Sequence, residues 1–134
     1  MLVVLVLAAT LVGCGGSAES QLVGTWKFVP DTSKPETSQF GKDLKANVNM
    51  KMTIEADGTY TETTDSFQSG SMTVPAYFSE GSWTFDDGEF MKTEEKLDGK
   101  PNDDTYSTVF YLSDDGNRLE GTSKTGSKLT YLKE

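Results

Sequence analysis

The sequence predicts an all-β domain: an eight-stranded antiparallel up-and-down meander that closes into a barrel. The chain of 134 residues contains seventeen threonines, five tyrosines and seven phenylalanines, residue types that favour strands. From residue 22 onward, apolar and polar side chains alternate with a period of two in short runs, as in half-buried strands. Turn signals such as Asp-Gly separate the runs. Closure into a barrel would leave no exposed strand edge.

The eight predicted strands follow one another along the chain. They span residues 24–30, 47–55, 59–66, 77–85, 89–97, 105–113, 118–123 and 127–133, with loops at 68–71 and 98–104. In the second run Val48, Met50, Met52 and Ile54 share one face. In the first, Trp26 and Phe28 face away from Lys27, which makes Trp26 a predicted core residue.

Residues 31–46, between the first two predicted strands, lack this alternation. We expect a short helix or lid there, with its N-cap at Ser33 or Lys34 and with Gly41 weakening it. This is the longest connection in the domain, and its Phe40 and Leu44 are placed to cover the end of a barrel.

The amino terminus has the pattern of an export signal. Residues 2–12 form an apolar run of eleven residues, too short to span about 30 Å of hydrocarbon but typical of a signal-peptide core. The run ends in Leu11-Val12-Gly13-Cys14, which resembles the bacterial lipobox. That resemblance implies lipid on Cys14 and attachment of the chain to a bacterial membrane in the cell envelope. In an ordinary signal peptide, Cys14 would instead be left as a free thiol.

These features divide the chain into three parts. Residues 1–13 are the expected signal peptide, 14–21 a lipidated Gly/Ser-rich tether, and 22–134 the barrel domain. Two or more acyl chains would hold the protein firmly, because each buried CH₂ contributes about 0.8 kcal/mol.

Charge and composition disfavour several function classes. A formal net charge of −9 disfavours nucleic acid as a partner. Histidine is absent, which removes the commonest general base and zinc ligand. The acidic pairs Asp86/Asp87, Glu94/Glu95, Asp103/Asp104 and Asp114/Asp115 lack calcium-loop spacing and, apart from Glu94/Glu95, suit turns. We therefore expect no enzyme activity, no catalytic residue, no metal site and no cofactor.

Four segments carry a family resemblance. They are Leu22-Val23-Gly24-Thr25-Trp26, Asp57-Gly58-Thr59-Tyr60-Thr61, Gly81-Ser82-Trp83-Thr84-Phe85 and Asp86-Asp87-Gly88. Together they resemble those of bacterial lipocalin-like lipoproteins, over residues 22–131. The resemblance implies that Trp26 packs at the closed end of the barrel beneath a cation, for which Lys128 and Lys133 are the candidates. Fatty-acid-binding proteins place an Arg two residues before a Tyr on the last strand, where this chain has Leu129 before Tyr131.

Two functions remain open. In the first, the protein is a membrane-anchored binding module for a small, neutral, apolar ligand that enters near residues 31–46. Its possible pocket is lined by Trp26, Met50, Met52, Tyr60, Trp83, Tyr106, Phe110 and Tyr131. In the second, these side chains fill the barrel, and the protein is an interaction or structural module of the envelope that works through its outer surface.

Overall fold

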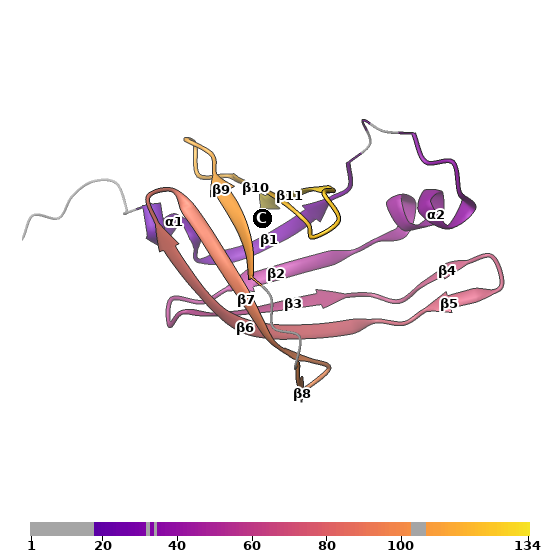
Figure 1. The fold of residues 1–134 in the computed structure, drawn as a ribbon, viewed down its shortest axis with the longest axis horizontal. Helices are drawn as coiled ribbons and strands as arrows, with labels where there is room; N and C mark the ends of the chain where they lie inside the picture. Colours follow the sequence, from indigo (N-terminus) through magenta and orange to yellow (C-terminus); the bar gives the residue numbers. More distant parts are fainter. Residues whose placement is uncertain (1–17, 32, 34, 103–106) are drawn as a thin grey trace, which may run out of the picture.

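A closed eight-stranded antiparallel barrel is the central feature of the computed structural model, which describes residues 18–31, 33, 35–102 and 107–134 (Figure 1). Its strands are β1 (Gly24–Val29), β2 (Met50–Ile54), β3 (Thr59–Thr64), β6 (Tyr77–Asp86), β7 (Glu89–Leu97), β9 (Ser107–Leu112), β10 (Arg118–Thr122) and β11 (Lys128–Lys133). Each pairs with its neighbours along the chain, and the pairing of β1 with β11 closes the ring. The predicted fold class and meander order are confirmed.

Two short hairpins stand where the sequence predicted loops. Strands β4 (Phe67–Ser69) and β5 (Met72–Val74) pair across a turn at Gly70, whose positive φ of 61° suits a tight turn. Strand β8 (Lys100–Pro101) pairs with the end of β7 across a turn in which Asp98 and Gly99 have positive φ. The loop predictions were wrong because the flanking runs are too short to show an alternation.

The helix expected within residues 31–46 is present but begins later than predicted. Helix α2 spans Gln39–Asn47, and its N-cap is Ser38, whose Oγ accepts from the backbone N–H of Gly41 at 3.0 Å. Ser33 is not the cap, since its N–H and hydroxyl both donate to Asp31, and Lys34 lies outside the described residues. Because α2 continues through Asn47, strand β2 starts at Met50 rather than at residue 47.

A second, shorter helix changes the expected tether. Helix α1 spans Ala18–Leu22, so residues 18–21, the second half of the expected tether, are helical. Leu22 is fully buried in the barrel core. None of the helices that the structure describes is long and apolar enough to cross a bilayer.

The barrel has its own hydrophobic core, formed by side chains that alternate inward along the strands. The buried cluster comprises Leu22, Trp26, Met52, Ile54, Tyr60, Trp83, Phe90, Phe110, Leu119 and Tyr131. Among the described residues, the buried cluster and the strand pairings lie within residues 22–133. The burial of Trp26 confirms its prediction as a core residue. On β7, Phe90 is inward, whereas its neighbour Met91 is 38% exposed.

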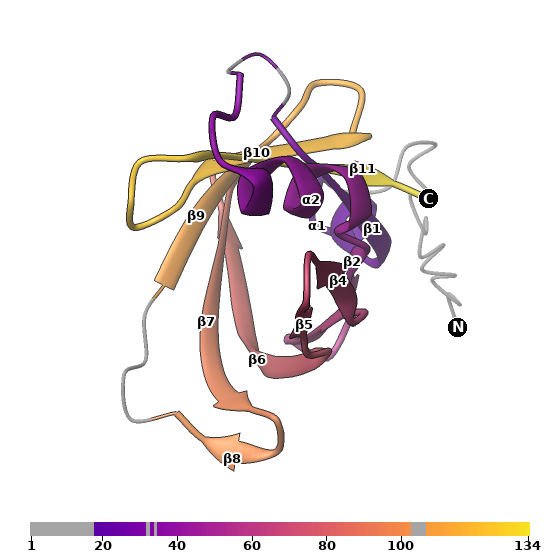
Figure 2. The ribbon, with the colours of Figure 1, turned by 90° about the vertical axis from the view of Figure 1, so that its right-hand side faces the viewer.

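The two ends of the barrel differ. At one end α1 packs beside β1, where the Trp26 indole N–H donates to the carbonyl of Leu22 at 2.8 Å. Lys133 is the cation over Trp26, with its Nζ 5.6 Å from the ring centroid. At the opposite end lie α2 and the β4–β5 hairpin (Figures 1 and 2). We call these the closed end and the mouth.

Candidate functional site

The expected pocket residues meet in one place, but they pack against one another. Trp26, Met52, Tyr60, Trp83, Phe110 and Tyr131 all belong to the buried core, and half-buried Met50 packs against it. Tyr106 lies outside the described residues. Ring contacts run from Trp83 through Phe90 and Phe110 to Tyr131, with centroids 5.6–6.0 Å apart. Aromatic side chains therefore occupy much of the barrel axis.

A buried polar cluster interrupts this apolar interior. The Nζ of Lys92 lies 3.1 and 3.3 Å from the two carboxylate oxygens of Glu62. The hydroxyl of Tyr131 donates to Glu62 Oε2 at 2.6 Å. Side-chain exposure is only 12% for Lys92 and 6% for Glu62. We call Glu62, Lys92 and Tyr131 the interior triad.

The interior triad joins strands that are not neighbours. Glu62 is on β3 and Lys92 on β7, with β6 between them, and Tyr131 reaches in from β11. On β6, Ser79 pairs with Glu62 and Trp83 with Lys92, and the inward position between them is Gly81. A Cβ at Gly81 would lie 1.9 Å from the backbone oxygen of Thr93 and 3.0 Å from the Tyr60 ring. Gly81 thus allows β6 to lie close to β7 and to the Tyr60 ring between the positions of Glu62 and Lys92.

The surroundings of the triad are also partly polar. A cavity of about 10 Å³ lies beside it, lined by Tyr60, Lys92, Glu94 and Thr108, a volume close to that needed by a single water molecule. Glu94 accepts from the side-chain amide of Asn102 at 2.6 Å. The buried hydroxyls of Thr64 and Ser79 have no hydrogen-bond partner in the described part of the chain.

The electrostatic state of Tyr131 follows from this burial. Desolvation first, and the nearby negative charge of Glu62 second, raise the pKa of the Tyr131 hydroxyl well above its usual value. The phenol therefore stays protonated and donates to the carboxylate. Lys92 is held over two rings as well, with its Nζ 5.2 Å from the centroid of Tyr60 and 5.9 Å from that of Phe110.

The two charged members of the triad, Glu62 and Lys92, were not predicted from the sequence. The apolar lining expected for the barrel is wrong on the wall formed by β3, β6 and β7. The sequence did contain a signal. Glu62 lies two residues after Tyr60, and Lys92 two residues after Phe90, so each charged side chain points to the same face of its strand as a buried aromatic one. For Lys92 the inward face was ambiguous, because Phe90 and Met91 are adjacent and both apolar.

A larger pocket lies at the mouth, between α2 and the ends of β1 and β11. It has a volume of about 210 Å³, below the 300–1,000 Å³ typical of drug-sized ligands. Its walls are lined by Phe28, Pro30, Asp31, Glu36, Leu44, Lys45, Val48, Ser127, Lys128 and Leu129. Lys45 and Glu36 form an ion pair of 3.1 Å at this site. The mouth pocket thus combines apolar side chains with charged groups.

Helix α2 closes the mouth pocket and is attached mainly to the β4–β5 hairpin. The ring of Phe40 lies 6.4 Å from that of Phe67, and the hydroxyl of Ser69 donates to Asp43 at 2.9 Å. Phe40 and Leu44 remain 42% and 38% exposed. A helix held by so few buried contacts belongs to the less stable part of a fold.

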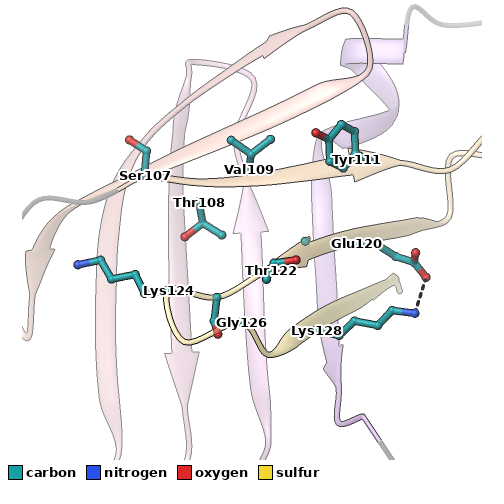
Figure 3. A pocket seen from close by; sticks show the side chains of 11 residues that line it. Ser107, Thr108, Val109, Tyr111, Glu120, Thr122, Lys124, Gly126 and Lys128 are labelled. Carbon is teal, nitrogen blue, oxygen red and sulfur yellow. Dashed lines mark ion pairs between the residues drawn. The ribbon is translucent and has the colours of Figure 1, made fainter. Parts of the chain in front are cut away.

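A third hollow, of about 690 Å³, lies on the outside of the barrel between β9 and the β10–β11 turn (Figure 3). The pairing of β9 with β10 ends at Phe110 and Gly121, after which the strands separate. Exposed side chains such as Tyr111, Lys124 and Lys128 border it, and Lys128 pairs with Glu120 at 3.6 Å. Its lining is mostly polar and exposed, so we assign no ligand to it.

Acidic side chains act as turn caps in this structure. Asp57 accepts from the hydroxyl and N–H of Thr59, which lowers its pKa. Asp115 accepts from the hydroxyl of Ser113 and the N–H of Asn117, with the same effect on its pKa. Glu94 faces the interior while Glu95 accepts from Ser82 on β6. Asp103 and Asp104 lie outside the described residues, and among the residues described no acidic, Cys or His group could hold a metal.

Comparison with known proteins returned no match, whether against family models, curated proteins or solved structures. A functional proposal therefore rests on the barrel fold, the interior triad and the mouth pocket.

Proposed function

We propose that this protein is a lipid-anchored lipoprotein of the bacterial cell envelope, with a lipocalin-like barrel that binds a small ligand at its mouth. The observation that supports ligand binding is the mouth pocket between α2, β1 and β11. Clefts with apolar walls and a few polar groups are the usual small-molecule sites. The packed aromatic axis argues against a ligand deep inside the barrel.

The proposed anchor would give the barrel an orientation. Cys14 is only four residues from Ala18, the first residue of α1, and α1 packs at the closed end through Leu22 and Trp26. Four extended residues reach at most about 14 Å. The closed end would thus face the membrane, with the mouth on the far side, open to ligands from the aqueous phase.

Loss of the anchoring cysteine should release the protein from the membrane. Replacing Cys14 with serine removes the only thiol in the chain and with it the proposed acylation site. We expect the variant to move from the membrane to the soluble fraction on centrifugation of cell lysates, because no surface basic patch would hold a chain of net charge −9 at anionic headgroups. Continued membrane association of Cys14→Ser would contradict lipid anchoring.

The ligand proposed for the mouth pocket is small and has an apolar part. Phe28, Leu44 and Leu129 supply apolar walls, while a pocket of about 210 Å³ limits the size of the guest. Charges of both signs border it, so polar substituents at its rim are compatible with binding. Opening of α2 would be needed to admit anything larger.

A polar group in the pocket wall should abolish binding of an apolar probe. We expect Leu44→Asp, in protein made without residues 1–14, to weaken binding of a hydrophobic fluorescent dye at least tenfold, because it places a charge against Phe28 and Leu129. Leu132→Asp is the matched control, since Leu132 is equally exposed at 38% but lies on the outer face of β11. Fluorescence titration gives both affinities.

The same titration tests the alternative, an interaction or structural module with a filled barrel. That alternative is favoured by the packed ring contacts along the axis. Absence of saturable dye binding at micromolar concentration, or equal effects of the two substitutions, would rule out the mouth site and leave the outer surface as the functional one.

A further inference from the structure

Glu62 is held in the way that a protein holds a bound carboxylate ligand. A cation and a phenol converge on it: Lys92 Nζ at 3.1 Å and the Tyr131 hydroxyl at 2.6 Å, both to Oε2. The three groups come from three different strands, none adjacent to another in the barrel. Charge-assisted hydrogen bonds of this kind are stronger than neutral ones.

The cluster is enclosed, and this fixes what it can accept. Glu62 is 5% exposed and Tyr131 is 2% exposed, so solvent screens their interaction weakly. The positive charge of Lys92 is directed at Glu62 and at the faces of two aromatic rings. In the native chain, Lys92 and Tyr131 are therefore already occupied by the carboxylate of Glu62.

We propose that Lys92 and Tyr131 form a buried carboxylate-binding site whose occupant is the chain's own Glu62. Glu62 thereby acts as a specificity residue that keeps anionic ligands out of the barrel interior. When the carboxylate of residue 62 is removed, the site takes a small free monocarboxylate instead.

The size of that ligand follows from the chemistry of the side chain. Replacing Glu62 with alanine removes a CH₂–COO⁻ unit and keeps the Cβ. Acetate is this unit with one further hydrogen, so it matches both the charge and most of the volume removed. Chloride carries the same charge but offers neither the shape nor two oxygens for Lys92 and Tyr131.

The test compares thermal unfolding of the full chain, in nonionic detergent at neutral pH, in sodium acetate and in sodium chloride at equal ionic strength. For Glu62→Ala we expect acetate to raise the unfolding midpoint by roughly 5 °C, with saturation at high concentration, because a ligand bound only to the folded state stabilises it. The parent protein should show no difference between the two salts. The double variant Glu62→Ala/Lys92→Met should lose the acetate effect.

Equal midpoints of Glu62→Ala in acetate and chloride would overturn the proposal, as would an acetate effect that survives Lys92→Met. If Glu62→Ala does not fold in chloride, refolding yield replaces the midpoint: recovery in acetate alone supports the site, and recovery in neither salt counts against it. This outcome is independent of ligand binding at the mouth, which involves none of the triad residues.

Discussion

Replacing Trp26 with alanine is expected to lower the free energy of unfolding by about 3 to 5 kcal/mol, the usual cost of truncating a large buried aromatic side chain. Trp26 is fully buried. Its strand, β1, pairs with β2 on one side and with β11 on the other. The cost is large against the 5–15 kcal/mol of total stability usual for a single domain. Denaturant unfolding monitored by circular dichroism measures the change.

Two further contacts are lost with the Trp26 side chain. Its indole N–H holds the Leu22 carbonyl at the end of α1, and its ring lies under Lys133. We therefore expect α1 to detach from the closed end in this variant. Lys27→Ala serves as the control, because Lys27 is the exposed neighbour on the same strand and should change stability by less than about 0.5 kcal/mol. A Trp26→Ala loss below about 1 kcal/mol would show that the closed end does not depend on this residue.

The strand meander was predictable because this chain repeats one local pattern. In β2, and around Trp26 in β1, inward apolar residues alternate with outward polar ones, and tight turns such as the one at Gly58 end the runs. Periodicity of two then indicates both the strand and its inner face. The same rule fails on β7, where Phe90 and Met91 are adjacent and either could be inside. Phe90 is the inward residue because it pairs with Phe85 on β6 and Phe110 on β9. This strand register is set by tertiary structure and cannot be derived from the local sequence.

The candidate sites were less accessible to sequence reasoning than the fold. Lys92 and Glu62 are thirty residues apart, and nothing local indicates that they meet across β6. Their contact arises because β3 and β7 flank β6 in the barrel. The mouth was easier to place, since the segment from Asp31 to α2 is the longest connection between barrel strands. The helix start at Ser38 could not be chosen from sequence among several possible caps.

Loss of the positive charge inside the barrel is expected to be as costly as loss of Trp26. Lys92→Met keeps an unbranched side chain but leaves the Glu62 carboxylate buried, held by the Tyr131 hydroxyl and no longer by the ammonium group of Lys92. Removing one member of a buried ion pair typically costs about 3 to 5 kcal/mol, because the remaining charge is uncompensated. Denaturant unfolding at neutral pH measures the loss.

The strand itself offers a matched control. Lys96, four residues further along β7, pairs with Glu80 at 3.2 Å on the outer face, where the two side chains are 52% and 34% exposed. Lys96→Met should cost no more than about 1 kcal/mol, because exposed ion pairs are screened by solvent.

The double variant Lys92→Met/Glu62→Gln separates the charge effect from loss of packing. The Glu62→Gln change removes the uncompensated charge and keeps an acceptor for Tyr131, so the double variant should be more stable than Lys92→Met alone. If Lys92→Met costs no more than Lys96→Met, the interior pair contributes nothing beyond a surface ion pair. If adding Glu62→Gln lowers stability further, the cost of Lys92→Met comes from packing rather than from an unpaired charge.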